Sequence, residues 1–424
     1  MTTSVHTNEE ILASILIQIT IVILVARAAG ACAAAMRQPR AVGEIVAGLM
    51  LGPSLFGYLF PEVSSALFPA DAAQTMWMIA QIGLILLMFQ IGSDFEFSLL
   101  GEKSNRKSVL FVTLASVSVP LATGFGIGRL AAPILAPDID PLSFSLFMAV
   151  AMAITAVPIL GRILAEYGLT RERVGVVAIS SAAANDVIGW VILAMISAIV
   201  AAGFSLGAFS LQILGLIGLI VGLIVVGRPL AAWLVRRFPT QGLAMSPVLI
   251  ACVIGLMFLA GVATQKLGIF TIFGGFLIGL LFHPHVAFVE AWRKTIGQFV
   301  LVFFLPIFFT LTGLRTNLLG LDTMNEWLWC AGLFAASVIS KIGPVYLAAR
   351  LSGLKSDESA ALGILMNTRA LMELIVLNIG LSMGVIPQDV FTMMVIMAVG
   401  TTIMTGPLIN QIPFIAANGR RHAA

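Results

Sequence analysis

Long apolar stretches separated by short polar breaks make up most of this chain. An apolar run of about 20 residues is long enough to cross a bilayer as a helix. The pattern predicts thirteen membrane-spanning helices, at about residues 10–36, 42–60, 74–99, 107–134, 142–167, 172–202, 208–236, 243–264, 268–284, 294–316, 326–351, 357–383 and 389–413. The sequence therefore predicts an all-α polytopic membrane protein.

The placement of the basic residues predicts how these spans are oriented. Only 10% of the 424 residues are charged and 59% are hydrophobic, whereas a soluble domain carries about 25% charged residues. One set of alternate connections, with the C-terminus, holds Arg37, Arg40, Lys103, Arg106, Lys107, Arg162, Arg171, Arg173, Arg236, Arg237, Arg293, Lys294, Arg350, Lys355, Arg420 and Arg421. The opposite set holds only Lys266 and Arg315. Because basic loops stay on the cytoplasmic side, we expect the N-terminus outside, the C-terminus in the cytoplasm and, after so short a tail, no soluble regulatory domain.

The two halves of the chain resemble each other weakly. Three pairs of positions match in order: Gly48 with Gly275, Gly92 with Gly313, and Thr155 with Thr368. The matched spans are seven apart, an odd number, so the two halves have opposite orientations in the membrane. Inverted repeats of this kind are typical of secondary transporters.

Two of the spans carry signs of a broken helix. The fifth span has Pro158 near its middle, and proline removes a backbone donor and clashes with the preceding turn. The twelfth span has Asn367-Thr368-Arg369 at the matching place. The backbone groups freed at such breaks can face a cavity and an ion, although proline kinks are also common in membrane helices for packing alone.

A few charged side chains fall deep inside the apolar spans. Asp186 lies about halfway along its span, and Lys341 is similarly central on another. A charge near the bilayer centre is costly and usually functional. Two opposite charges at similar depth are expected to be partners or competitors in one site, the alternative being a structural ion pair.

The chemistry of these groups favours transport of a small cation. A cation and a proton can compete for the oxygens of the Asp186 carboxylate, and the amide oxygen of Asn185 is a second candidate ligand. Arg369 and Glu373 are four residues apart and can pair on one helix face, so we expect them to be mainly structural supporting charges. The spans hold no nucleophile-and-base pair or metal-ligand cluster, so neither an enzyme nor a cofactor is expected.

Seven stretches carry a resemblance to a known family. They are QPRAVGEIVAGLMLGPSLFG, AQIGLILLMFQIG, TAVPILGRILAEYGL, the Asn185-Asp186 pair, LPIFFTLTGLRTNL, Lys341-Ile-Gly and MNTRALMELIVLNIG. Together they resemble the monovalent cation:proton antiporter-2 family, within the sodium/proton antiporter superfamily. The last stretch, with VFTMMVIMAVGTTIMTGPL, is similar to the plant and fungal cation/proton exchangers of that family.

The resemblance implies the sodium/proton antiporter fold, in which two discontinuous helices cross near the ion site. It implies a scaffold and dimer domain (residues 1–99 and 243–316), a linker helix (208–236) and a core ion-transport domain (107–202 and 326–413). Transport would be an elevator-like movement of the core against the scaffold of a homodimer.

The resemblance also implies roles for individual residues. Asp186 would be the carboxylate that binds cation and proton, Lys341 its basic partner, and Thr155 a support for the site. Better-understood bacterial sodium/proton members have two aspartates in tandem, whereas Asn185 stands first here. One carboxylate suggests one-for-one exchange, unless Lys341 itself titrates.

The function predicted from the sequence is exchange of Na⁺ or K⁺ for protons across a membrane, most simply a bacterial inner membrane. The choice between sodium and potassium stays open, and no nucleic-acid partner is expected. Two alternatives are a sodium-coupled organic-anion symporter on a related fold, which would need a larger polar cavity, and a cation channel, which would need no proton counter-flow.

Overall fold

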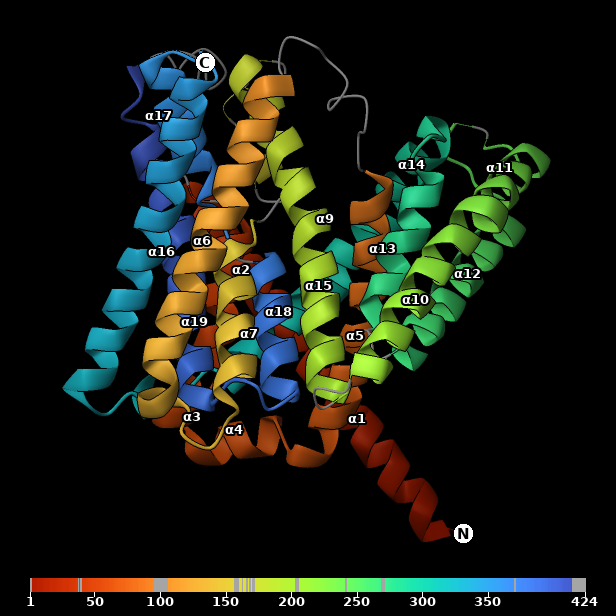
Figure 1. Ribbon diagram of the computed structural model, residues 1–424. Helices are drawn as coiled ribbons and strands as arrows, with labels where there is room; N and C mark the ends of the chain where they lie inside the picture. The colour runs from red at the N-terminus through yellow and green to blue at the C-terminus, as the bar shows by residue number, and fades with distance from the viewer. Residues whose placement is uncertain are drawn as a thin grey trace. The chain divides into compact units, whose positions relative to one another are not determined.

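The computed structural model describes residues 2–36, 38, 40–94, 106–155, 160–161, 163–164, 167, 169, 172–202, 206–240, 242–267, 271–369 and 371–413 (Figure 1). Throughout these residues the regular elements are helices. Ten of the described helices are long and apolar enough to cross a membrane, and three shorter apolar helices accompany them. The prediction of an all-helical membrane protein with about thirteen spans is therefore confirmed.

The chain divides into two compact units. Unit 1 comprises residues 1–26, 56–96 and 197–311, and unit 2 comprises residues 27–55, 97–196 and 312–424. Three of the described helices have residues in both units: α1 (Thr2–Ala35), α9 (Arg173–Ala202) and α15 (Leu305–Arg315). The functional division into scaffold, linker and core stays a prediction, as does the orientation of the termini.

Unit 1 is built around two helices that pack closely, α5 (Ala70–Ser93) and α13 (Thr271–Phe282). The aromatic side chains of Phe89, Phe282, Phe288 and Trp292 are fully buried together in this unit, with ring centroids 4.7 Å apart for Phe89 and Trp292. The other helices of the unit are α3 (Phe56–Leu59), α4 (Pro61–Leu67), α10 (Leu206–Gly222), η2 (Leu223–Gly227), α11 (Arg228–Arg237), α12 (Pro247–Lys266), α14 (Val286–Trp292), η3 (Arg293–Gly297) and η4 (Val300–Phe304).

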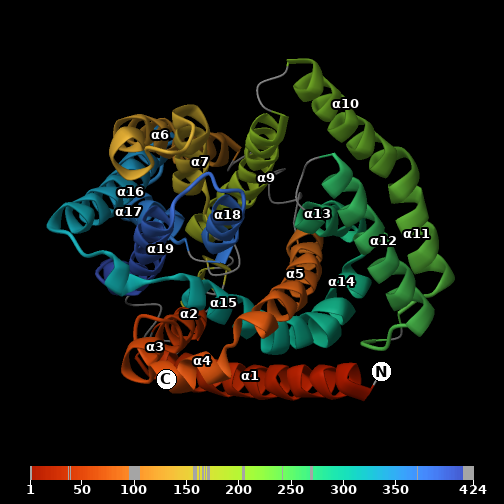
Figure 2. The ribbon, with the colours of Figure 1, turned by 90° about the horizontal axis from the view of Figure 1, so that it is seen from below.

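Unit 2 holds the buried charges. Its helices are α2 (Arg40–Leu51), α6 (Arg106–Leu135), α7 (Pro141–Ala153), α9 (Arg173–Ala202, as far as Ile196), η5 (Leu318–Gly320), α16 (Met324–Leu351), α17 (Ser356–Met366), α18 (Leu371–Ser382) and α19 (Gln388–Ile409). Helix α6 packs against α7 and α16, and α16 packs against α17 and α19 (Figure 2). A Cβ on Gly124 or Gly128 of α6 would come within 2.6 Å of α7 backbone atoms, so these glycines permit the close contact that small residues give membrane helices.

Both predicted helix breaks lie in unit 2. Asp140 caps the start of α7 by accepting from the Ser143 amide at 2.8 Å, and the helix ends where Ile154 turns to extended backbone (φ −69°, ψ 147°). The predicted cause of this break, Pro158, lies outside the described residues. In the matching half, α17 ends at Met366, and the backbone stays non-helical through Thr368 and Arg369 before α18 begins.

The predicted repeat recurs as a pair of matching glycine contacts. In unit 2, a Cβ on Gly52 would come within 2.4 Å of the Gly313 carbonyl oxygen. In unit 1, a Cβ on Gly279 would come within 2.9 Å of the Gly92 Cα. The alignment of the halves places Gly279 on Gly52 and Gly92 on Gly313, so each half makes the same contact. This recurrence agrees with the predicted internal repeat.

Candidate functional site

Asp186 lies in the middle of α9 and is buried, with 2% of its surface exposed. Among the residues that the structure describes, neither of its carboxylate oxygens has a hydrogen-bond partner. Buried carboxylates are normally paired or hydrogen-bonded, because an isolated charge in an apolar interior is costly. Asp186 is therefore a candidate ligand-binding group, since its buried carboxylate has no hydrogen-bond partner among the described residues.

Asn185, the neighbouring residue, is fully engaged in a chain of hydrogen bonds. The Ser116 hydroxyl of α6 donates to Asn185 Oδ1 at 3.1 Å, and Asn185 Nδ2 donates to Thr155 Oγ1 at 3.2 Å. Thr155 Oγ1 in turn donates to the Met366 carbonyl at 3.3 Å. This chain joins α6 and α9 to both helix breaks, so the predicted residues Asn185 and Thr155 lie together.

Lys341 lies on α16 with its side chain fully buried. Its ammonium donates to two backbone carbonyls, Ser116 O at 2.9 Å and Ala153 O at 2.5 Å. The second of these belongs to the last residue of α7, where the broken helix leaves carbonyls without intrahelical donors. Lys341 thus bonds to backbone carbonyls, and no hydrogen bond joins it to the Asp186 carboxylate among the described side chains.

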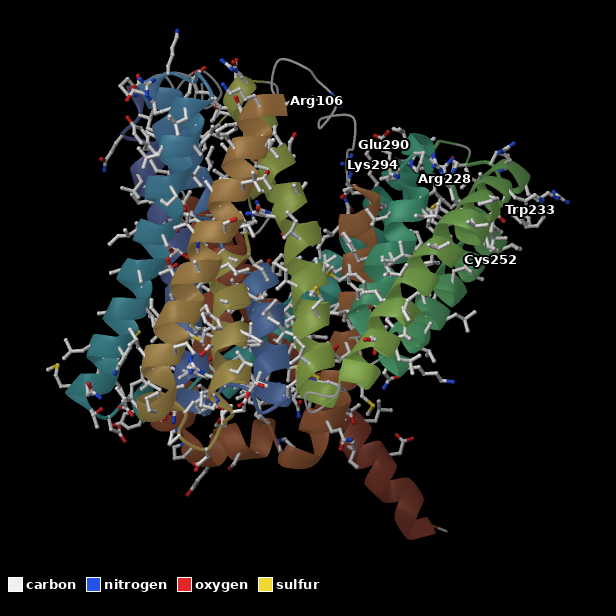
Figure 3. The ribbon with its side chains drawn as sticks, in the orientation of Figure 1. Arg106, Arg228, Trp233, Cys252, Glu290 and Lys294 are labelled. Carbon is white, nitrogen blue, oxygen red and sulfur yellow. The ribbon has the colours of Figure 1, made fainter. Side chains whose placement is uncertain are left out.

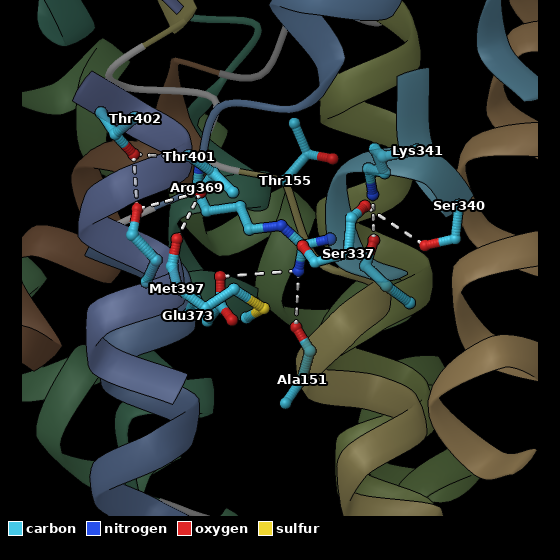
Figure 4. Close-up of polar contacts among 12 residues, drawn as sticks. Ala151, Thr155, Ser337, Ser340, Lys341, Arg369, Glu373, Met397, Thr401 and Thr402 are labelled. Carbon is cyan, nitrogen blue, oxygen red and sulfur yellow. Dashed lines mark hydrogen bonds and ion pairs between the residues drawn. The ribbon is translucent and has the colours of Figure 1, made fainter. Parts of the chain in front are cut away.

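Arg369 and Glu373 form the second pair of buried charges. Both side chains are 0% exposed, and Arg369 Nη1 lies 3.6 Å from Glu373 Oε2. The same guanidinium nitrogen donates to the Ala151 carbonyl of α7 at 3.2 Å, so the Arg369 side chain reaches from one broken helix to the other (Figure 4). The Arg369 backbone amide donates to Thr402 Oγ1 of α19 at 3.3 Å. These contacts tie the break after α17 to its neighbours.

Sequence reasoning found the charged residues of this cluster but missed Ser116. Ser116 is completely buried and contacts both Asn185 and Lys341. It stands in an apolar run, SVSVPL, without a charge to mark it. Among the described residues no group of three His, Cys, Asp or Glu side chains could hold a metal ion.

Comparison with known proteins places this chain in a family. The sequence profile described as "Sodium/hydrogen exchanger, transmembrane" matches residues 19–413, nearly the whole chain. The chain belongs to the sodium/hydrogen exchanger family. The predicted resemblance is thereby confirmed, and the protein is an integral membrane protein of this family.

Relatives of this family member include proteins from bacteria, plants and yeast. The chain is 36% identical to the Na(+)/H(+) antiporter NhaS4 of Synechocystis over 94% of its length and 97% of that protein. It is 34% identical to Cation/H(+) antiporter 17 of Arabidopsis thaliana and 29% identical to K(+)/H(+) antiporter 1 of Saccharomyces cerevisiae. These two matches cover 95% and 88% of this chain, but only 48% and 43% of the plant and yeast proteins. The chain therefore spans about half the length of these relatives.

A solved structure shares the fold. The sodium proton antiporter MjNhaP1 from Methanocaldococcus jannaschii superposes with a TM-score of 0.67 at 17% sequence identity, over 97% of this chain and 99% of that one. At this identity the likeness establishes the fold. The predicted sodium/proton antiporter architecture, with inverted repeats and two discontinuous helices, is confirmed.

Proposed function

We propose that this protein exchanges a monovalent cation, Na⁺ or K⁺, for protons across a membrane, and that both ligands compete for the Asp186 carboxylate. The observation that carries the proposal is the buried carboxylate whose oxygens have no hydrogen-bond partner among the described residues. It stands beside two broken helices, in a chain of the sodium/hydrogen exchanger family.

Competition at one carboxylate is sufficient for exchange. Water no longer solvates the buried Asp186 oxygens, so either a proton or a cation stabilises them. The site is proposed to switch sides of the membrane readily when Asp186 holds a ligand, and poorly when Asp186 is empty and charged. Each cation carried one way must then be exchanged for a proton carried the other way. Thr155 and the carbonyls at the helix breaks support the site by fixing the backbone around it.

Exchange fits the relatives better than the two alternatives. Their names describe Na⁺/H⁺, K⁺/H⁺ and cation/H⁺ antiporters, and the Bacillus cereus relative GerN is named a Na(+)/H(+)-K(+) antiporter. These names support a proton antiporter over an organic-anion symporter or a channel. They include both cations, so the proposal keeps sodium and potassium.

The proposed stoichiometry rests on the number of carboxylates at the candidate site. Asp186 binds one cation or one proton, and the preceding position is an amide, Asn185. The ammonium of Lys341 donates to the Ser116 and Ala153 carbonyls, and the proposal is that it keeps its proton throughout the exchange. The proposal is therefore one-for-one exchange, which carries no net charge and does not respond to membrane potential.

The proposed movement is an elevator-like displacement of the core (107–202 and 326–413) against the scaffold of a homodimer. The positive-inside pattern supports an N-terminus outside and a C-terminus in the cytoplasm. The proposed location is a bacterial inner membrane.

Cation-driven proton movement in proteoliposomes tests the proposal. A pH-sensitive dye in the lumen reports proton flux when Na⁺, K⁺ or Li⁺ is added outside, with and without a clamped membrane potential. We expect a response to Na⁺, K⁺ or both that is insensitive to the clamp and is lost in Asp186→Asn. An organic-anion requirement, or flux that persists in correctly inserted Asp186→Asn protein, would contradict it.

A further inference from the structure

Ser116 of α6 makes two different contacts with the site. Its hydroxyl donates to Asn185 Oδ1 at 3.1 Å, and its carbonyl accepts from Lys341 Nζ at 2.9 Å. The hydroxyl also lies 3.1 Å from the Thr113 carbonyl one turn earlier, so its single hydrogen is shared. The residue is completely buried, so water does not substitute for these partners.

The direction of the hydrogen bonds fixes the orientation of the Asn185 amide. A carbonyl only accepts, so the Thr155 hydroxyl must donate its hydrogen to Met366 O. Its oxygen is then left to accept from the amide nitrogen of Asn185, which lies 3.2 Å away. The amide oxygen therefore points to Ser116, which holds the other end of the side chain.

Holding Asn185 also orients Asp186. Adjacent residues of an α-helix point about 100° apart, so a fixed Asn185 side chain sets the rotation of α9 at this turn. One turn earlier, the Ser181 hydroxyl of α9 donates to the Val109 carbonyl of α6 at 3.4 Å. The two helices are thus joined at two levels, but only the Ser116 contact reaches the site.

We propose that Ser116 is a positioning residue for the exchange: its hydroxyl sets the Asn185 amide, and through it the Asp186 carboxylate, while its carbonyl keeps Lys341 at the same site. The inference rests on the proposed competition at Asp186. It assigns the residue a function in cation binding in addition to its contribution to helix packing.

The test is the KM for the cation in the proteoliposome assay. Ser116→Ala removes the hydroxyl but keeps the carbonyl that holds Lys341, so we expect about a tenfold higher KM, equivalent to about 1.4 kcal/mol, with little change in kcat. Ser116→Thr keeps a hydroxyl and is expected to restore KM. Ser181→Ala is the matched control, because Ser181 is an equally buried serine that joins the same two helices; its KM should equal that of the wild type.

A double-mutant cycle separates positioning from packing. If Ser116 acts through Asn185, then Ser116→Ala combined with Asn185→Ala should have the KM of Asn185→Ala alone. Should Ser116→Ala fail to fold, Ser116→Cys replaces it in the assay and the cycle, with an intermediate rise in KM expected because a thiol is a weaker donor.

Three results would overturn the inference: an unchanged KM in the Ser116 variant, an equal KM change in Ser181→Ala, or independent effects in the double mutant. Wild-type protein without exchange would instead overturn the proposed function, and this inference with it.

Discussion

Removing one member of the buried pair Arg369–Glu373 should destabilise the protein strongly. The two charges are 3.6 Å apart and both side chains are 0% exposed. With an effective dielectric constant of about 20, their attraction is about 332/(20 × 3.6), or roughly 5 kcal/mol. The substitution Glu373→Gln forfeits this attraction and leaves the guanidinium buried without its counter-charge, a change that typically costs about 3–5 kcal/mol.

The control is a second i,i+4 ion pair among the described residues, Glu290 with Lys294. It has a shorter separation, 2.8 Å, but its side chains are 49% and 47% exposed and lie on unit 1 (Figure 3). Water and salt screen exposed pairs, so Glu290→Gln should leave the free energy of unfolding unchanged within error. The comparison separates burial from distance as the source of the effect.

The assay is unfolding by SDS titration from mixed micelles, followed by tryptophan fluorescence. We expect Glu373→Gln to lower the free energy of unfolding by about 3–5 kcal/mol. The double variant Arg369→Met/Glu373→Gln should regain most of that loss, because no uncompensated charge remains. Equal effects of Glu373→Gln and Glu290→Gln, or a double variant weaker than either single one, would refute the reasoning.

Three further predictions concern other parts of unit 2. Gly313→Ala should destabilise the fold by about 1–3 kcal/mol or more in the same titration, because its Cβ would fall 2.0 Å from Gly48 backbone; Gly343→Ala, with open space around it, should not, and equal effects would contradict the close contact. Lys341→Ala should lower stability and change the pH dependence of exchange, because it removes a buried cation and leaves two carbonyls without their donor. If neither stability nor the pH dependence changed, Lys341 would have no role in the exchange. Asp140→Ala should cost about 1 kcal/mol at neutral pH. Hydrogen bonds from Ser143 hold the pKa of Asp140 below its usual value, so this stabilisation is present above pH 4 or so and is lost as pH falls through the lowered pKa; an equal deficit in acid and at neutral pH would contradict it.

The sequence was sufficient to predict the buried charges of the candidate site. Asp186, Lys341 and Arg369 stand out because charges are rare in apolar spans. Pro158 and the Asn367-Thr368-Arg369 stretch predicted the two helix breaks. Matching glycines in the two halves predicted the repeat, and the contacts of Gly52 and Gly279 agree with it.

The bonding partners could not be predicted in the same way. Lys341 was predicted as the basic partner of Asp186, and that role stays a prediction; nothing in the sequence indicated that its ammonium bonds to the carbonyls of Ser116 and Ala153. Every residue has a backbone carbonyl, so the sequence does not indicate which carbonyls a broken helix leaves free to accept a hydrogen bond. Ser116 was missed for a related reason, since its importance depends on which helices pack together.

Proton release on cation binding tests the central claim most directly. Purified protein in weakly buffered detergent solution is titrated with Na⁺ or K⁺ while a pH indicator and a calorimeter record protons released and cation bound. With Asp186 protonated at the starting pH, the account predicts one proton released per cation bound, weaker cation binding as pH falls, and neither binding nor release in Asp186→Asn. Cation binding that releases no protons at any pH, or release that persists in Asp186→Asn, would contradict competition at this carboxylate.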